Sequence, residues 1–299
     1  MVSKISVVIN TLNNEGNIKR ALESVKWADE ILVCDMHSED KTSGIAKEMG
    51  VKVIQVKKVE YVELARNFAI SKASNDWILV LDPDEEIPES LKERLVEISS
   101  KMKEINYVRI PRKNIIFGKW MQASGWWPDL NIRFFKKGKV KWSNKIHRPP
   151  EAIGEGLDLS ANEKLAIIHN NYESISQFIL RMDRYTKVEA NELIKGGYKF
   201  EWKDLINKPV NEFLSRFFSN KGYKDGLHGL VLSLLQAFSY LTVYLKIWDK
   251  ESFQQSEVSL SDIADEKKKI GQDVDYWINQ TIKSKNSIKS FFQKIKAKK

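Results

Sequence analysis

Cysteine is almost absent from this sequence. Its 299 residues include a single one, Cys34, which excludes an intramolecular disulfide framework and any zinc site built from a cysteine cluster. A chain of this length buries a large core without covalent crosslinks. We therefore expect a protein of a reducing compartment, and we interpret Cys34 as a small residue of a buried strand rather than a nucleophile.

Histidine is scarce as well, and several catalytic motifs are missing. The four histidines lie far apart, at positions 37, 147, 169 and 228, so the sequence does not indicate a His-rich metal cage. It shows no zinc-ligand spacing, no glycine loop of the kind that cradles phosphate and no Ser-His-Asp order. These absences leave carboxylates as the main candidates for chemistry.

Negative charge is absent from the end of the chain. The formal net charge is +9, and residues 283–299 contain seven lysines and no acid, so the rest of the chain carries only +2. Because the basicity is concentrated in a tail and does not line a groove, we expect no nucleic-acid partner.

The N-terminal apolar run is too short for a secretory leader. The apolar run after the first lysine is only five residues long, Ile5–Ile9. A signal peptide needs a longer apolar region and a cleavage site with small residues. We interpret this run as a first buried strand and expect the catalytic part of the chain to stay in the cytoplasm.

Strand and helix patterns alternate through the first third of the chain. Alternation of this kind favours an α/β fold with a mostly parallel sheet that helices cover on both faces. Strands are expected over 5–9, 30–34, 51–56 and 77–81, and helices over 16–27, 41–49, 61–73 and 88–103. Later strands are expected over 107–111, 130–135 and 165–169, and helices within 174–207.

The strongest chemical signal is the acidic run Asp82-Pro83-Asp84-Glu85-Glu86, directly after the strand expected over 77–81. Four carboxylates in five positions repel one another, and a hard divalent cation such as Mn²⁺ or Mg²⁺ would relieve that repulsion while sharing its coordination with phosphate oxygens. The alternative is a solvated turn followed by an acidic helix start.

Two other strand ends carry polar groups. The first expected strand runs into Asn10-Thr11-Leu12-Asn13-Asn14-Glu15, and the second ends at Asp35. Ligands of open α/β sheets bind at the carboxyl ends of the strands, so these groups could line a pocket for a nucleotide and a metal together with Asp82 and Asp84. A turn or helix-cap role is the alternative for Glu15 and for Asp35.

In this order the motifs resemble those of family 2 glycosyltransferases with the GT-A fold. The segments concerned are TLNNE at 11–15, VCDMHSEDKT at 33–42, ARNFA at 65–69, DWILVLDPDEE at 76–86, GWWPDLNIRFF at 125–135, KIHR at 145–148 and KGYKDGLHGL at 221–230. The last segment is similar to the C-terminal part of a branch that includes lipopolysaccharide core-biosynthesis glycosyltransferases, some of them glucosyltransferases.

The resemblance implies a fold, a donor and a cofactor. It implies a GT-A α/β domain over 1–170, with a mostly parallel central sheet flanked by helices, and a helical C-terminal region over 171–299. The donor would be a nucleotide-diphospho-sugar, with a UDP-sugar favoured, and the cofactor a divalent metal, Mn²⁺ or Mg²⁺. The acceptor would be a glycan or a lipid-linked sugar.

The resemblance also implies roles for single residues. Thr11 and Glu15 would contact the nucleoside, Asp35 the base or ribose, and Arg66 the nucleotide from its helix. Asp82 would face the ribose or the metal. Asp84 and His147 would serve the metal, although relatives carry an acid after this histidine where the present chain has Arg148, with Glu151 displaced. A surface arginine at 66 and a structural histidine at 147 are the alternatives.

The acceptor side is expected near Trp126-Trp127-Pro128-Asp129. Inverting transfer needs a carboxylate as general base for the acceptor hydroxyl, and Asp129 is the candidate. The two tryptophans could offer a flat apolar face to a sugar ring. The alternative is that the tryptophans belong to the core and that Asp129 is a turn acid.

The C-terminal region carries two segments with a possible membrane role. Residues 226–245 contain no charged side chain, so a helix over 226–248 could lie in the membrane interface, span the membrane or pack as a soluble or dimer helix. Residues 282–299 set aromatic and aliphatic residues among lysines, which suits a basic amphipathic anchor or a solvated tail. We expect peripheral association with the inner face of the cell membrane, and a homodimer remains open.

Two other functions are weighed against the transferase. A sugar-phosphate nucleotidyltransferase should carry a Gly-rich basic phosphate loop after the first strand, where this chain has TLNNEGN at 11–17. A non-catalytic basic adaptor for membranes or nucleic acid would explain the lysines of the tail but not the acids at the strand ends.

Overall fold

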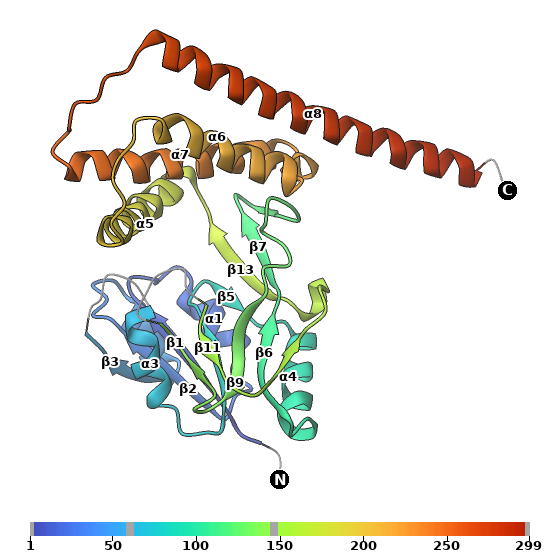
Figure 1. The fold of residues 1–299 in the computed structure, drawn as a ribbon. Coiled ribbons are helices and arrows are strands. Elements are labelled where there is room, and N and C mark those ends of the chain that lie inside the picture. The colour runs from blue at the N-terminus through green and yellow to red at the C-terminus, as the bar shows by residue number, and fades with distance from the viewer. Residues whose placement is uncertain (1–2, 58–62, 144–148, 297–299) are drawn as a thin grey trace. The chain divides into compact units, whose positions relative to one another are not determined.

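The computed structural model describes residues 3–57, 63–143 and 149–296, and the chain divides into two compact units (Figure 1). Unit 1 comprises residues 1–120 and 126–173, and unit 2 comprises residues 121–125 and 174–299.

A seven-stranded sheet forms the centre of unit 1. Its strands are β1 (Ile5–Thr11), β2 (Glu30–Asp35), β3 (Lys52–Gln55), β4 (Trp77–Leu81), β6 (Ile105–Ile110), β9 (Asn131–Lys136) and β12 (Glu155–Asp158). They lie in the order β12-β6-β9-β4-β1-β2-β3. Within this sheet only β9 runs antiparallel to its neighbours, β4 and β6. The expected α/β fold with a mostly parallel sheet is confirmed.

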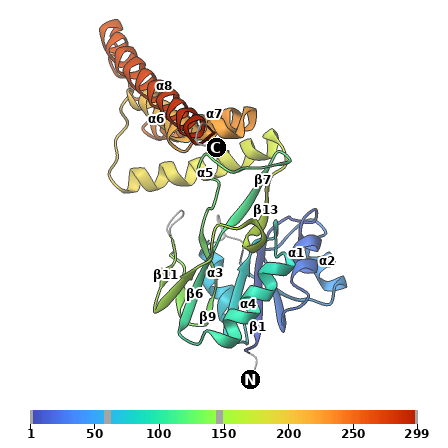
Figure 2. The same cartoon turned by 90° about the vertical axis from the view of Figure 1, so that its right-hand side faces the viewer.

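Helices cover this sheet on both faces, which explains why its central strands are apolar throughout. Every residue of β1 and β4 is buried, as expected of a parallel sheet without a solvated face. The cluster on one face includes residues of α1 (Ile18–Ser24), α2 (Thr42–Glu48) and α4 (Glu89–Lys101), and the cluster on the other face includes residues of α3 (Glu63–Ser71). In Figure 2, α1 and α2 lie at the right of the sheet, away from α3. The four expected helices are confirmed, with somewhat later starts and earlier ends.

A second sheet of four strands belongs to unit 1. It consists of β5 (Glu85–Glu86), β13 (Ile167–Tyr172), β7 (Arg112–Ile116) and β8 (Lys119–Trp120), in that order. Of these, only β13 was expected. The strand β5 is a pair of acids, and β7 reads Arg-Lys-Asn-Ile-Ile, so neither shows the alternation that marks a strand in sequence. The two-stranded sheet of β10 (Val140–Lys141) and β11 (Glu151–Ala152) was not expected either.

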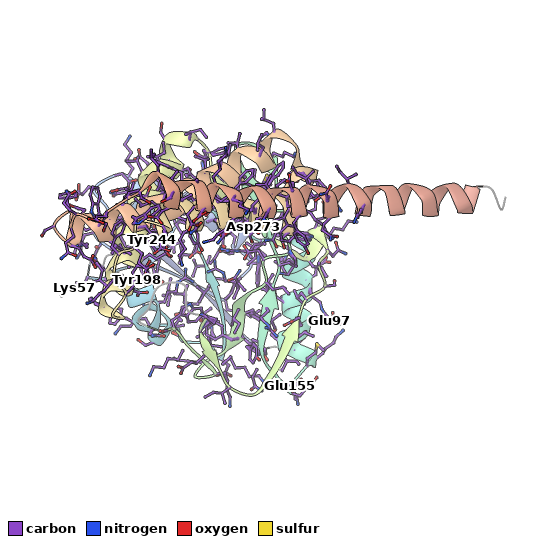
Figure 3. The ribbon with its side chains drawn as sticks, turned by 45° about the horizontal axis from the view of Figure 1, so that its top comes forward. Lys57, Glu97, Glu155, Tyr198, Tyr244 and Asp273 are labelled. Atoms are coloured by element: carbon purple, nitrogen blue, oxygen red, sulfur yellow. The ribbon has the colours of Figure 1, made fainter. Side chains whose placement is uncertain are left out.

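Unit 2 is helical. It contains α5 (Ile175–Lys195), α6 (Asp204–Leu214), α7 (Leu227–Lys250) and α8 (Leu260–Lys296). Its small core consists of Ala190, Val243, Tyr244 and Ile247, and the ring of Tyr198 packs edge-on against that of Tyr244 at 5.7 Å between centroids (Figure 3). Helices within 174–207 and over 226–248 were expected, whereas the start of α8 at Leu260 was not.

Packing across the sheet generates a first prediction. Phe134 is fully buried and stacks on Trp77, with ring centroids 4.5 Å apart. The substitution Phe134→Ala should lower the free energy of unfolding by about 3–5 kcal/mol, because it leaves a cavity in a close-packed core. Urea denaturation followed by tryptophan fluorescence measures this change. Phe68, which is 47% exposed, is the control, and Phe68→Ala should cost less than about 1 kcal/mol. Equal losses for both variants would contradict the packing described.

Candidate functional site

Three neighbouring strands bring polar residues to one edge of the central sheet. The strands β2, β1 and β4 are adjacent and parallel. Thr11 pairs in register with Asp35, and Ile9 pairs with Leu81, the residue before Asp82. The carboxyl ends of these strands therefore lie side by side, which is where open α/β sheets bind ligands.

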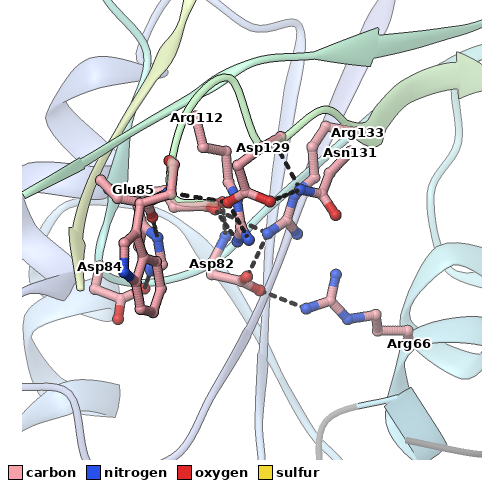
Figure 4. A network of polar contacts seen from close by, with 11 residues as sticks. Arg66, Asp82, Asp84, Glu85, Arg112, Asp129, Asn131 and Arg133 are labelled. Atoms are coloured by element: carbon pink, nitrogen blue, oxygen red, sulfur yellow. Dashed lines mark hydrogen bonds and ion pairs between the residues drawn. The ribbon is translucent and has the colours of Figure 1, made fainter. Parts of the chain in front are cut away.

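Asp82 lies between two arginines. Its Oδ1 accepts a hydrogen bond from Arg66 Nη2 at 2.7 Å, and its Oδ2 accepts one from Arg133 Nη2 at 2.6 Å (Figure 4). Burial opposes ionisation, but the guanidinium groups of Arg133 and Arg66 hold the pKa of the Asp82 carboxyl far below its ordinary value. Asp82 is therefore an ionised carboxylate whose two oxygens both serve these ion pairs.

Glu85 is a member of the site that the sequence analysis did not single out. Its side chain is fully buried, accepts from Arg133 Nη2 at 2.8 Å and lies 3.5 Å from Arg112 Nη1. Its Oε2 also accepts the backbone N–H of Asp82 at 2.9 Å. The signal available in the sequence was an arginine at 133 inside an apolar strand, because a buried cation needs a carboxylate partner.

The two buried arginines keep unused donors. Arg66 and Arg133 are 7% and 4% exposed. Among the described residues, Arg66 Nε, Arg133 Nε and Arg133 Nη1 have no hydrogen-bond partner. Because a buried donor without a partner is costly, these N–H groups are suited to an anionic ligand at the carboxyl edge of the sheet.

Asp129 is held on both of its oxygens. Its Oδ2 accepts from Arg112 Nε at 2.8 Å and from Asn114 Nδ2 at 3.0 Å, and its Oδ1 accepts from Asn131 Nδ2 at 3.0 Å (Figure 4). Burial opposes ionisation, but Arg112, aided by these hydrogen bonds, lowers the pKa of the Asp129 carboxyl. Its side chain stays 24% exposed, so the carboxylate is both ionised and reachable.

The hydrogen bonds of Asn114 fix the tautomer of His169. Asn114 Nδ2 donates to the Trp126 carbonyl at 2.7 Å as well as to Asp129, and both partners can only accept. The amide oxygen of Asn114 therefore faces His169 Nδ1, 2.6 Å away. Since this oxygen only accepts, Nδ1 carries a proton and donates, so Nε2 is the ring nitrogen that could bind a metal.

Asp84 and His169 form the pair best suited to a metal. His169 Nε2 lies 3.7 Å from Asp84 Oδ1. Two ligand atoms that each lie about 2.1 Å from one ion are at most about 4.2 Å apart, so both can reach it. A histidine that donates its other ring nitrogen to a carbonyl oxygen is typical of a metal ligand. Within the described ranges no group of three or more His, Cys, Asp or Glu side chains is placed to hold a metal.

Thr11 and Asp35 are buried, whereas Glu15 is exposed. Asp35 accepts from Ser38 Oγ and from Gln55 Nε2 at 2.9 Å, and Glu15 accepts the backbone N–H of Lys41 at 3.0 Å. The Glu15 contact fastens the loop after β1 to the loop after β2, whereas Asp35 contacts its own loop and the last residue of β3. The turn role considered for both acids is therefore present, alongside their position at the carboxyl edge.

His147, the two tryptophans and Cys34 are the other residues for which the sequence suggested a role. His147 lies outside the described residues, so its expected metal role has no structural account. Trp126 and Trp127 are half-buried, which differs from both a fully exposed platform and a core position. Cys34 is fully buried, and burial raises the pKa of its thiol to about 11, as expected of a core residue.

Known sequences similar to this chain are glycosyltransferases. Residues 6–153 match the description Glycosyl transferase family 2. An uncharacterised glycosyltransferase of Rickettsia typhi is 32% identical over 247 residues, which cover 80% of this chain and 84% of the relative. The lipopolysaccharide core biosynthesis glycosyltransferase LpsC of Rhizobium meliloti is 23% identical over 258 residues, with coverage of 84% and 94%.

Among solved structures, the chain is similar to glucosyl-3-phosphoglycerate synthase from Mycobacterium tuberculosis, which was crystallised with Mn²⁺, uridine diphosphate and glucosyl-3-phosphoglycerate. The match has a TM-score of 0.43 and 17% identity, and it covers 65% of this chain and 80% of that chain. These bound molecules were found in that enzyme. The match over residues 6–153 and the long alignment with the Rickettsia typhi protein establish the family: this chain belongs to glycosyl transferase family 2, and its α/β unit has the GT-A fold.

Proposed function

We propose that the enzyme is an inverting glycosyltransferase of cell-envelope glycan synthesis, in the lipopolysaccharide class. It moves a hexose, with glucose the first candidate, from a nucleotide-diphospho-sugar to a glycan or lipid-linked acceptor. Membership of family 2 and the likeness to a lipopolysaccharide core enzyme support this proposal. A UDP-sugar is the favoured donor.

The observation that carries the proposal is the pair of buried arginines beside Asp82. Arg66 and Arg133 keep N–H donors without a partner among the described residues, at the carboxyl edge of β1, β2 and β4. The diphosphate of a nucleotide-sugar is an anion that could accept from these donors. Thr11, Glu15 and Asp35 lie at the ends of the adjacent strands or just beyond them, where the nucleoside would bind.

Asp84 and His169 are the residues of this chain proposed to hold a divalent metal, Mn²⁺ or Mg²⁺. Nε2 of His169 lies 3.7 Å from Asp84 Oδ1, so one cation could bind both atoms. When bound, such an ion supplies Lewis-acid neutralisation of the charge that develops on the departing diphosphate. His147 stays a proposed additional ligand.

Asp129 is proposed as the general base. Ionised and partly exposed, it accepts the proton of the acceptor hydroxyl while that oxygen forms its bond to the anomeric carbon of the sugar. The bond between the anomeric carbon and the diphosphate oxygen breaks, and the nucleoside diphosphate leaves with the electron pair. Direct displacement of this kind inverts the anomeric carbon, so an α-linked donor gives a β-linkage.

A donor screen tests the reaction. The purified enzyme should hydrolyse or transfer sugar from one nucleotide-sugar in the presence of Mn²⁺ or Mg²⁺ and lose that activity with EDTA. Asp84→Asn should lower the rate at least about 100-fold, and His169→Gln should lower it about 10- to 100-fold with a weaker apparent affinity for the metal. Asp76→Asn, an exposed acid in the same unit, should change nothing. Pyrophosphate release from a sugar phosphate and a nucleoside triphosphate would instead indicate a nucleotidyltransferase.

The pH dependence tests the role of Asp129. The base is active when ionised, so kcat should fall only as the pH drops through its pKa, which Arg112 holds below the ordinary value of 3.8. In Arg112→Gln burial dominates, the pKa rises, and the acid limb of kcat should move up by about 1–3 pH units. Arg109→Gln, which removes an exposed arginine paired with Asp158, is the control. An unchanged acid limb in Arg112→Gln would argue against Asp129 as the base.

Unit 2 is proposed to bind the inner surface of the cell membrane. Helix α7 is long and apolar enough by length and composition to cross a membrane, which is weak support by itself, and 33% of its most apolar window is buried. Its exposed residues Leu227, Leu234, Phe238 and Leu245 recur at intervals of 7, 4 and 7, so they form one narrow stripe on the helix. The seven lysines of 283–299 add an attraction for anionic lipid.

Vesicle sedimentation tests this assignment. The protein should bind vesicles that contain anionic lipid more tightly than zwitterionic ones, and the double variant Leu234→Ser with Phe238→Ser should lose most of this binding, because it removes apolar area from the stripe. Ile153→Ser, an exposed apolar position of unit 1, should bind as wild type does. Unchanged vesicle binding in the double variant would contradict the assignment. A wild type that dimerises in light scattering and a double variant that does not would assign the stripe to a second copy.

A further inference from the structure

Five residues in the middle of the transferase sequence belong to the helical unit. Residues 121–125 group with unit 2, whereas the chain on either side of them, up to Trp120 and from Trp126, groups with unit 1. The side chains of Met121 and Ser124 are fully buried, and Ala123 is 8% exposed. Gln122 and Gly125 are exposed, so three of the five residues anchor the segment in unit 2.

The side chain of Asp225 binds the backbone of this segment. The carboxylate is 5% exposed. It accepts the N–H of Gln122 at 3.1 Å and the N–H of Ala123 at 2.8 Å. One side chain thus accepts hydrogen bonds from two successive backbone N–H groups of the segment.

Further backbone contacts complete the attachment. The N–H of Ser124 donates to the carbonyl of Asn220 at 2.8 Å, and Arg216 Nη1 donates to the carbonyl of Ser124 at 2.9 Å. Ser124 has a φ of 57°, a conformation that a non-glycine residue keeps only when its surroundings enforce it. The segment is thus fixed at three successive residues.

Glycines allow the close approach that this geometry needs. A Cβ on Gly222 would lie 2.4 Å from Ser124 Oγ, and a Cβ on Gly229 would lie 1.9 Å from the carbonyl oxygen of Gly222. These glycines belong to KGYKDGLHGL at 221–230, the segment in which Asp225 lies. The motif therefore forms the surface against which residues 121–125 pack.

The clamped segment leads directly into the proposed acceptor side. Gly125 is bonded to Trp126, whose carbonyl accepts from Asn114, and Asp129 follows three residues later. A shift of the clamped end would be transmitted along this short connection. Displacement of a catalytic group by about 1 Å costs about 100-fold in rate.

We propose that Asp225 is a positioning residue of the transferase, which holds residues 121–125 so that Trp126 and Asp129 keep their productive position. The inference rests on the proposed role of Asp129. It assigns to the helical unit a part in catalysis that is separate from membrane binding, and it gives the KDG sequence at 224–226 a function.

The test compares Asp225→Ala and Asp225→Asn with the matched control Asp249→Asn, an exposed acid of α7. In the full-length enzyme, Asp225→Ala should lower kcat about 10- to 100-fold, while the affinity for UDP, measured by calorimetry, should stay within about 2-fold. Asp225→Asn keeps one acceptor oxygen, so its kcat should be intermediate. The control should match wild type. Circular dichroism establishes that each variant is folded.

Hydrogen exchange keeps the test independent of the substrate. In Asp225→Ala the amides of Gln122 and Ala123 should exchange faster, and the increase should extend to residues 126–131. This result would support positioning even if no donor sugar were turned over, in which case the proposed function alone would fail. A folded Asp225→Ala with wild-type kcat, or with faster exchange confined to 121–125, would overturn the inference, and so would an equal loss of affinity for UDP.

Discussion

The candidate site depends on the pairing of buried carboxylates with buried guanidinium groups. Glu85 is fully buried and Asp82 partly so, and Arg133 lies between them and pairs with both. Removing one member would leave an uncompensated charge in a low-dielectric region, at a cost of about 3–5 kcal/mol. The acids after β4 are therefore divided between two tasks. Asp82 and Glu85 order the arginines, and Asp84 is left to face His169.

This division changes the interpretation of the acidic run. In the sequence, four neighbouring carboxylates suggest that a cation relieves their repulsion. In the structure, the cations for Asp82 and Glu85 are arginines supplied by α3 and β9, together with Arg112 of β7. These elements meet at the carboxyl edge of the central sheet. The fold thus supplies fixed positive charge to the same place where a nucleotide-sugar would bring its diphosphate.

The sequence predicted the central sheet well because its strands are short apolar runs between helical patterns. It also predicted that Thr11, Asp35 and Asp82 would meet, since parallel strands align their carboxyl ends. It did not predict the second sheet, because β5 and β7 consist largely of charged and polar residues. Glu85 lies on β5, which was not expected. His169 lies on β13, which was expected, but the pairing of β13 with β5 and β7 was not. Glu85 contacts Arg112 and Arg133, 27 and 48 residues away in the sequence, and His169 contacts Asn114, 55 residues away, so no local pattern records these pairs.

Asn114 joins the two halves of the site with a single amide. Its amide nitrogen donates hydrogen bonds to the Trp126 carbonyl and to Asp129, and its amide oxygen accepts one from His169 Nδ1. An aspartate there, although nearly identical in shape, would turn an oxygen toward the Asp129 carboxylate and the Trp126 carbonyl, and repulsion would replace attraction on both sides. Deamidation of this one side chain, a common form of chemical ageing in proteins, would thus disturb the metal side and the acceptor side together.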